Sequence, residues 1–258
     1  MCLILVAWCS HPHYPLVVAA NRDEFFSRRT ARADFLPDHP QVLAGRDIEG
    51  GGTWMGITRS GRFAALTNYR DPSSQHQDAP SRGALVADFL GGDDSIDAYL
   101  ARIVPRAPAY NGFNLLLGDM SKENRRLVWF SNVAGAPTEL TPGVYGVSNH
   151  LLDSPWPKVG AGKTALAGAL SALPDAAPLF DLLRDDGVHP DEALPRTGVS
   201  LEWERLLSSA FVRAPGYGTR NSTVLTLGAD GWANFDEQTW LEEGRPGGRA
   251  HFRFALAA

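Results

Sequence analysis

The stretch that decides the fold lies near the start of the chain and reads Cys2-Leu-Ile-Leu-Val-Ala-Trp-Cys9, Ser10-His-Pro-His-Tyr-Pro15, Leu16-Val-Val-Ala-Ala20 and Asn21-Arg-Asp-Glu24. Two apolar runs flank a segment with two prolines, and this pattern predicts a β-hairpin. A hairpin that turns near Pro12 pairs residues whose numbers sum to about 24, so Cys2 is expected opposite Arg22, within about two residues of register. The hairpin therefore brings the Cys2 thiol beside the polar segment that ends the second run.

The composition is that of an ordinary globular protein. The 258 residues are 44% hydrophobic and 21% charged, which supplies a large core and excludes a disordered, collagen-like or coiled-coil chain. Basic residues number 24 and acidic residues 29, giving a net charge of -5, so the chain lacks the basic field that nucleic-acid binding needs. We therefore expect no nucleic-acid partner.

Cysteine usage and hydropathy indicate the compartment. The chain has two cysteines, Cys2 and Cys9, without a Cys-x-x-Cys spacing, so neither a disulfide framework nor a thiolate zinc site is expected. The apolar run Leu3–Trp8 is too short for a signal peptide, and no other run reaches the roughly 18 apolar residues of a spanning helix. A cytoplasmic protein with no membrane span and no metal site is predicted.

Strand patterns dominate both ends of the chain, and helical patterns lie between them, an order that favours an α+β fold over alternating βαβ units. Because no linker or internal repeat interrupts the chain, residues 1–258 are expected to form one domain. The expected strands are Leu3–Cys9, Leu16–Ala20, Thr53–Thr58, Phe63–Thr67, Phe113–Gly118, Leu127–Ser131, Val144–Val147, Thr223–Leu227, Trp232–Phe235 and Ala250–Ala255. The expected helices are Arg82–Phe89, Ser95–Val104, Lys158–Leu173, Pro178–Arg184 and Leu201–Phe211, with Ser81 and Ser200 as N-caps.

Three short motifs have simpler interpretations than a ligand site. Gly160–Thr164 ends like a phosphate-binding loop, but Pro157 stands where the first glycine of that loop belongs, so a helix start is favoured. His11 and His13 have no acidic or cysteine neighbour and are assigned to a turn. The basic pair Arg28–Arg29 is typical of solvated surface, and we assign it no role.

Cys2 carries the most direct chemical signal. Removal of Met1 would give one residue both a thiol and a free α-amine, and an amine with a pKa of about 7.7 to 8.0 accepts the thiol proton near neutral pH. A guanidinium at Arg22 would favour the thiolate, while Asp23 or Glu24 would orient the protonated amine. The simpler interpretation is a small apolar residue that begins a strand, beside a solvated strand end with local ion pairs.

The sequence also resembles a known family over nearly its whole length. The motifs that carry this resemblance to the NRDE, or transport and Golgi organisation, family are Met1-Cys2, Asn21-Arg22-Asp23-Glu24, Gly51-Gly52-Thr53-Trp54-Met55-Gly56, Thr67-Asn68-Tyr69-Arg70, Gly146-Val147-Ser148-Asn149-His150 and Thr219-Arg220-Asn221-Ser222-Thr223. The chain is more distantly similar to N-terminal nucleophile hydrolases of the choloylglycine hydrolase and penicillin V acylase type. That similarity implies a four-layer αββα sandwich and cleavage of non-peptide amide bonds.

The hydrolase resemblance implies roles for individual residues. Cys2 matches the nucleophile, Asn68 the oxyanion residue, Asn149 a second asparagine and Arg220 a late arginine near the nucleophile. An asparagine side chain that donates to a developing oxyanion contributes about 3 kcal/mol in other enzymes. Each asparagine is also typical of a turn that caps a strand.

The acidic residue of the site stays open between two candidates. In those hydrolases the arginine precedes the aspartate with two residues between them, whereas Arg22 and Asp23 are adjacent here. Asp23 and Glu24 are therefore both candidates for the acidic role.

The resemblance implies a cysteine amidohydrolase that requires no cofactor. Aromatic and apolar residues near the site in sequence order are expected either to line a pocket for a small apolar or acyl substrate or to belong to the core. They are Trp54, Met55, Phe63, Tyr69 and Trp156.

The alternative is a non-catalytic protein that binds or transfers haem or a lipid metabolite on the same scaffold, since the wider family is linked to both. Its candidate axial ligands are Cys2, His11, His13 and His150, and no Cys-x-x-Cys-His attachment motif is present. The substrate and the oligomeric state stay open at this point.

Overall fold

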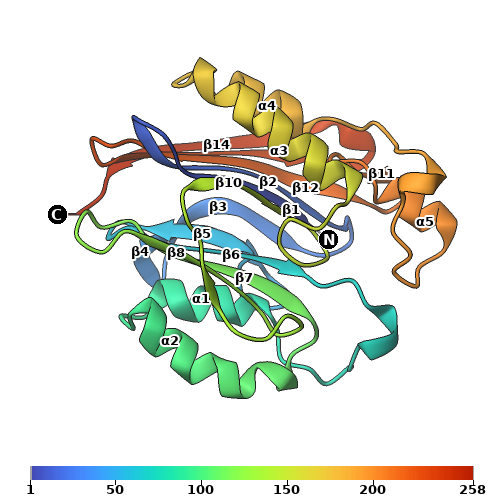
Figure 1. Ribbon diagram of the computed structural model, residues 1–258, viewed down its shortest axis with the longest axis horizontal. Helices are drawn as coiled ribbons and strands as arrows, with labels where there is room; N and C mark the ends of the chain where they lie inside the picture. Colours follow the sequence, from blue (N-terminus) through green and yellow to red (C-terminus); the bar gives the residue numbers. More distant parts are fainter. Residues whose placement is uncertain (1, 258) are drawn as a thin grey trace.

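The computed structural model describes residues 2–257 and contains two antiparallel β-sheets stacked face to face (Figure 1). Sheet A has the strand order β10-β1-β2-β12-β13-β14, with β11 beside β12, and sheet B runs from β3 to β9 in chain order. Sheet A contains β1 (Cys2–His11), β2 (Tyr14–Phe25), β10 (Gly143–Val147), β11 (Arg213–Ala214), β12 (Tyr217–Leu227), β13 (Trp232–Trp240) and β14 (Pro246–Ala255). Sheet B contains β3 (Thr30–Leu36), β4 (His39–Asp47), β5 (Met55–Thr58), β6 (Arg62–Asn68), β7 (Phe113–Asp119), β8 (Arg126–Ser131) and β9 (Thr138–Glu139).

Helices cover the outer face of each sheet. Helices α1 (Gly83–Gly91) and α2 (Ile96–Ile103) pack on sheet B, whereas α3 (Pro157–Ala169) and α4 (Ala177–Leu183) pack on sheet A, with α5 (Leu201–Leu206) near β11 (Figure 1). Short 3₁₀ turns span Pro72–Ser74, Val104–Ala109, Leu170–Ala172, Asp191–Ala193 and Glu242–Gly244. The layer order confirms the predicted α+β class and αββα sandwich. Within residues 2–257, no helix combines the length and the apolar content that a membrane crossing requires.

The central hairpin is apolar on both faces because it is covered on both. Leu3 and Leu5 pack in the layer under α3 and α4, whereas Ile4 and Val6 pack between the two sheets. Successive side chains of a strand point to opposite faces, so a strand buried on both sides becomes a continuous apolar run. This explains why the run in β1 is unbroken rather than alternating.

The predicted register of the hairpin is confirmed. Cys2 pairs with Arg22 and Leu3 with Asn21 across β1 and β2, and the chain turns at Pro12 and His13. The polar segment does not end the strand as expected, because β2 continues to Phe25 with β12 on its other side. Asn21, Arg22 and Asp23 are consequently buried in the sheet.

Several other expectations differ from the structure. Arg82, not Ser81, is the N-cap of α1, while Ser200 caps α5 as predicted by accepting from the Trp203 amide at 3.4 Å. Helix α5 ends at Leu206, five residues before the predicted end, Phe211. The Gly160–Thr164 motif lies inside α3, as the helix interpretation predicted.

Candidate active site

A pocket of about 430 Å³ opens where β1 begins and β6 ends. Cys2 and Arg22 line it from sheet A, and Asn68 lines it from sheet B. Further wall residues come from the segment before α1 and the loop before β5, including Arg82 and Trp54. Most of the lining side chains are polar or charged, so the pocket favours a polar group at the Cys2 end.

The backbone of Cys2 is held from two directions. Arg22 is its partner across the hairpin, and the Ser148 hydroxyl, just after β10, donates to the Cys2 carbonyl oxygen at 2.8 Å. Burial raises the pKa of the Cys2 thiol, and the charge of Asp23 acts in the same direction, whereas Arg22 and the Asp23 backbone N–H lower it. A thiol in this place needs a nearby base or cation to become a thiolate.

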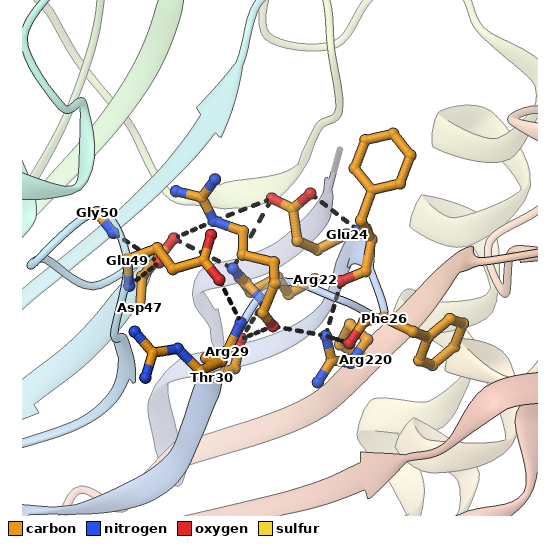
Figure 2. A network of polar contacts seen from close by, with 11 residues as sticks. Arg22, Glu24, Phe26, Arg29, Thr30, Asp47, Glu49, Gly50 and Arg220 are labelled. Atoms are coloured by element: carbon orange, nitrogen blue, oxygen red, sulfur yellow. Dashed lines mark hydrogen bonds and ion pairs between the residues drawn. The ribbon is translucent and has the colours of Figure 1, made fainter.

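The pleat of β2 sends neighbouring side chains to opposite faces. Arg22 and Glu24 line the pocket together with Arg28 and Asp47, and we call these four residues the pocket cluster. Figure 2 shows Arg22, Glu24 and Asp47 in one network of polar contacts. The Asp47 carboxylate lies 2.8 Å from Arg28 Nε and 3.3 Å from Arg22 Nη2, and Glu24 lies 3.8 Å from Arg22. Arg28 therefore has a place in the site that the sequence analysis did not give it.

Trp54 packs against the Arg22 guanidinium of the pocket cluster. The Arg22 guanidinium lies over the indole ring at 4.5 Å from its centroid, a cation–π contact. The indole in turn lies so close to Gly45 that a Cβ there would meet it at 2.3 Å. The stack of Gly45, Trp54 and Arg22 fixes the direction of the guanidinium beside Cys2.

On the opposite face of β2, a second group of charges lies under α3, and we call it the buried cluster. It consists of Asp23, Arg70, Lys158 and Glu204, all 7% exposed or less. Arg70 donates to Glu204 at 2.8 Å, and the Thr219 hydroxyl donates to Asp23 at 2.7 Å. Lys158 Nζ makes no hydrogen bond within residues 2–257.

Burial controls the protonation of the buried cluster. It raises the pKa of the Asp23 carboxyl, against the attraction of Lys158 and the hydrogen bond from Thr219. It lowers the pKa of Lys158 to about 8, against the attraction of Asp23 and Cys2. Asp23 and Lys158 thus support each other's charge near Cys2, and Asp23 also lines the Cys2 pocket.

The two predicted asparagines lie together but do different things. The Asn149 side chain donates to the Asn68 carbonyl oxygen at 2.9 Å, and the Arg70 amide donates to the Asn149 carbonyl oxygen at 2.8 Å. Asn149 therefore ties β6 to the end of β10. The Asn68 side-chain amide makes no hydrogen bond within residues 2–257 and lines the pocket with Cys2, which leaves it available to an occupant.

Arg220 does not lie at the thiol as the resemblance implied. It is the additional residue of a bulge in β12, because Thr219 pairs with Asp23 and Asn221 with Arg22. Its guanidinium donates to the carbonyl oxygens of Phe25 and Arg28 at 2.8 and 3.0 Å (Figure 2). Arg220 therefore holds the turn that follows β2, and it does not line the Cys2 pocket.

Of the five residues expected to line an apolar pocket or to belong to the core, only Trp54 lines the Cys2 pocket. Met55 and Phe63 belong to the core between the sheets. Tyr69 and Trp156 line a separate pocket with His150, whose ring lies 5.1 and 5.7 Å from theirs. Their positions along the strands, not their distance in sequence, decide which face they occupy.

The candidate axial ligands for haem lie in three separate places. Cys2 lines the pocket described above, while His11 and His13 lie at the hairpin turn, at the other end of β1. His150 lines the separate pocket, and its Nδ1 lies 2.6 Å from the Ser154 hydroxyl. Of these four residues, His11 and His13 are neighbours, with ring centroids 5.9 Å apart, whereas Cys2 and His150 line two different pockets.

Sequence reasoning missed several residues around Cys2. Asp47, Arg82, Lys158 and Glu204 stand outside every motif that was singled out. Arg70 belongs to the motif Thr67-Asn68-Tyr69-Arg70, but its sequence context does not indicate a role in the site. A lysine or glutamate in an expected helix gives no sign of burial, so only the packing of α3 and α5 reveals these two.

The comparisons with known proteins agree with this architecture. A solved structure, the Caenorhabditis elegans N-acylethanolamine-hydrolyzing acid amidase ortholog, is similar in fold, with a TM-score of 0.50 and 11% identity, over 86% of this chain and 92% of that chain. The Transport and Golgi organization protein 2 homolog of Homo sapiens is 38% identical, over 94% of each chain. The Drosophila melanogaster Transport and Golgi organization protein 2 is 31% identical, over 93% of this chain and 92% of that protein.

The family model agrees with these relatives. The family described as Transport and Golgi organisation 2 matches residues 1–242. The match includes Cys2, both charge clusters and the asparagine pair. The chain therefore belongs to the Transport and Golgi organisation 2 family.

Proposed function

We propose that this protein is an amidohydrolase that uses Cys2 as an N-terminal nucleophile on a non-peptide amide of a small substrate. One observation carries the proposal: the Cys2 side chain and the unbonded Asn68 amide line the same pocket from two different sheets. The proposal requires removal of Met1, which lies outside the described residues. No cofactor enters the reaction.

The reaction follows from the groups around Cys2. The freed α-amine takes the thiol proton, and the sulfur attacks the acyl carbon while the Asn68 amide donates to the oxygen that becomes negative. The amine returns the proton to the leaving nitrogen as the carbon–nitrogen bond breaks, which leaves a thioester on Cys2. Water then hydrolyses the thioester to a carboxylic acid and regenerates the thiol.

Asp23 is the better candidate for the acid that orients the α-amine. Glu24 is engaged by Arg22 at 3.8 Å and Arg28 at 3.7 Å on the pocket face. Asp23 is 1% exposed, interacts electrostatically with Cys2 and is supported by Lys158. A buried carboxylate with that support holds an ammonium group more firmly than a carboxylate shared by two arginines.

The fold similarity supports an amide as the bond to test first. The C. elegans relative is named as an amidase that hydrolyses N-acylethanolamines, and at 11% identity the likeness concerns the fold. The polar walls of the pocket argue against an entirely apolar substrate at the Cys2 end. A panel of small N-acyl amides with neutral and charged amine halves is therefore the suitable screen.

The experiment has two stages. Intact mass of the purified protein establishes whether Met1 is absent, and an activated acyl ester then tests whether Cys2 forms an acyl-enzyme. We expect a mass without one methionine, acylation of Cys2, and complete loss of acylation and amide turnover in Cys2→Ala.

Cys9→Ala is the matched control, because Cys9 is exposed on the same strand and lies outside the pocket. It is expected to keep full acylation and turnover. Retention of Met1 in an active protein, or equal turnover in Cys2→Ala, would overturn the proposal.

A further inference from the structure

The pocket contains a cation that the two charge clusters leave unneutralised. Arg82, the N-cap of α1, lines the same pocket as Cys2. Its Nη1 donates to the Gly112 carbonyl oxygen at 3.1 Å, and no acidic side chain within residues 2–257 lies within 4.0 Å of its nitrogens. Arg22 and Arg28, by contrast, share the carboxylates of Glu24 and Asp47.

Arg82 is removed from much of the solvent that would otherwise stabilise its charge. Burial lowers the pKa of its guanidinium, and the charges of Cys2 and Glu24 oppose that effect. A desolvated cation without a counter-ion costs free energy, and a ligand that supplies the negative charge recovers it. The arrangement is typical of a site in which the occupant completes the pairing.

The position of Arg82 is fixed by its backbone. The Thr53 amide donates to the Gly83 carbonyl oxygen at 3.3 Å, and a Cβ on Gly52 would lie 2.3 Å from the Gly83 carbonyl carbon. The loop before β5 thus packs directly on the start of α1. A guanidinium carried on such a rigid backbone presents a pre-organised fork for an anion.

We propose that Arg82 binds a carboxylate of the substrate and so selects amides that carry a carboxylate close to the scissile carbonyl. The inference rests on the proposed function only in taking Cys2 as the reacting atom. Arg82 lies on sheet B's side of the pocket and Arg22 on sheet A's. A carboxylate on Arg82 leaves the Arg22 side free for the thiol and the reacting carbonyl.

Two alkylating agents that differ by one charge test this selection. Iodoacetate and iodoacetamide react in the same way: the sulfur–carbon bond forms, the carbon–iodine bond breaks, iodide leaves and the thiol proton passes to solvent. Their rate ratio at Cys2 in a Cys9→Ala background, divided by the ratio for glutathione, isolates recruitment of the carboxylate. We expect this normalised ratio to be about tenfold above one, as a single charge-assisted contact provides.

Variants of Arg82 separate recruitment from thiol activation. Arg82→Gln is expected to bring the normalised ratio to about one, and Arg82→Lys to retain part of it. The control is Arg102→Gln, which removes an exposed arginine of α2 that pairs with Asp94. This variant is expected to leave the ratio unchanged. If Arg82→Gln slows both reagents equally, Arg82 acts on the thiol alone and the proposal is overturned.

The normalised ratio measured in the protein that keeps Arg82 tests carboxylate selection even if an Arg82 variant fails to fold. A normalised ratio of one or below in the Cys9→Ala protein overturns carboxylate selection directly. Because alkylation requires neither removal of Met1 nor turnover, a high ratio in a protein without amidase activity would refute the proposed reaction and keep the anion site.

Discussion

The pocket cluster and the buried cluster, which lie on opposite sides of β2, contain the same number of charges in different surroundings. The pocket cluster pairs two arginines with two carboxylates; Glu24, Arg28 and Asp47 keep 21%, 35% and 17% of their side-chain surface exposed, and Arg22 keeps 6%. The buried cluster also has two cations and two carboxylates, but the Arg70 and Glu204 side chains are only 5% and 3% exposed, and Lys158 Nζ has no hydrogen bond within residues 2–257.

This difference in burial indicates that the buried cluster lowers the stability of the fold more than the pocket cluster does. Exposed ion pairs cost little and contribute little, whereas buried charges cost several kcal/mol each unless geometry compensates them. The buried cluster surrounds Asp23 directly beneath Cys2. We infer that these charges are retained for the chemistry of the site and that the pocket cluster shapes its entrance.

The largest expected effect comes from breaking the buried ion pair. Glu204 accepts from Arg70 at 2.8 Å and from the Thr197 amide and hydroxyl at 2.7 Å each. Glu204→Gln removes the carboxylate that pairs with Arg70 in the interior, so the free energy of unfolding should fall by about 3 to 5 kcal/mol. Urea denaturation at neutral pH measures this change.

The control for that prediction is an exposed pair. Glu139 lies 2.9 Å from Arg126 and is 55% exposed, so Glu139→Gln should change stability by less than about 1 kcal/mol. Equal losses in the two variants would show that the buried cluster is no more sensitive than the surface.

Lys158 should produce the next largest effect, as a dependence on pH. Its pKa falls from 10.5 in the unfolded chain to about 8 in the fold. Below pH 8 Lys158 is protonated in both the folded and the unfolded chain, and folding carries the full cost of burying its charge. Between pH 8 and 10.5 the unfolded chain binds one more proton than the folded chain, so the free energy of unfolding rises with pH. Relative to Lys158→Met, the wild type should gain about 3 kcal/mol across this interval.

Lys163→Met is the matched control on the same helix, because Lys163 keeps 30% of its surface exposed and pairs with Asp153 at 2.8 Å. Its stability difference from the wild type should stay nearly constant over the same pH interval. A flat difference for Lys158→Met as well would mean that Lys158 stays protonated in the fold, and the support it gives Asp23 would need another explanation.

The sequence predicted the parts of the fold in which a local apolar pattern and the turn chemistry agree. The register of β1 and β2 followed from two apolar runs and a turn at Pro12, because local pattern and turn chemistry agree there. Strand β3 gave no signal, since Ala33 is its only buried residue and it lies at the edge of sheet B. Edge strands with one buried position lack the alternation on which such predictions depend.

The site was predictable only where it lies on predicted strands. Cys2 and Asn68 each stand at a strand end, and they line one pocket. Arg220 lies in a bulge, which no local pattern reveals, and its side chain donates to the carbonyl oxygens of Phe25 and Arg28. Lys158 reaches Asp23 through the packing of α3 on sheet A, a contact between residues far apart in sequence.

A smaller effect is expected at the glycines of the loop that forms the pocket wall. A Cβ on Gly52 would lie 2.3 Å from the backbone of Gly83, which cannot rotate away, so Gly52→Ala should cost about 1 to 3 kcal/mol and displace the loop. Gly51 has open space around it but a φ of 70°, so Gly51→Ala should cost about 1 kcal/mol.

These two variants separate backbone rigidity from charge in the pocket wall. Thermal melting gives the stabilities, and the iodoacetate ratio at Cys2 reports the position of Arg82. Gly52→Ala should lower that ratio and Gly51→Ala should leave it unchanged. The opposite order would mean that the loop does not hold the start of α1.

The smallest effect should come from the pocket cluster itself. Burial raises the pKa of Asp47, but the Gly50 amide and Arg28 outweigh it and lower the pKa below 3.8. Asp47 therefore stabilises the fold above pH 3.8 and loses that contribution as the pH falls through its folded value. Because Asp47 is partly exposed, Asp47→Asn should cost only about 1 kcal/mol at neutral pH.

The two clusters should also differ in how acid and salt change the effect of a substitution. The difference between wild type and Asp47→Asn should vanish in acid and shrink in high salt, since solvent screens a partly exposed pair. The loss in Glu204→Gln should change little with salt, because the Arg70 pair lies out of reach of mobile ions. Equal salt sensitivity in the two variants would mean that water enters both clusters alike, and Asp23 would then have no advantage over Glu24 as the acid beside Cys2.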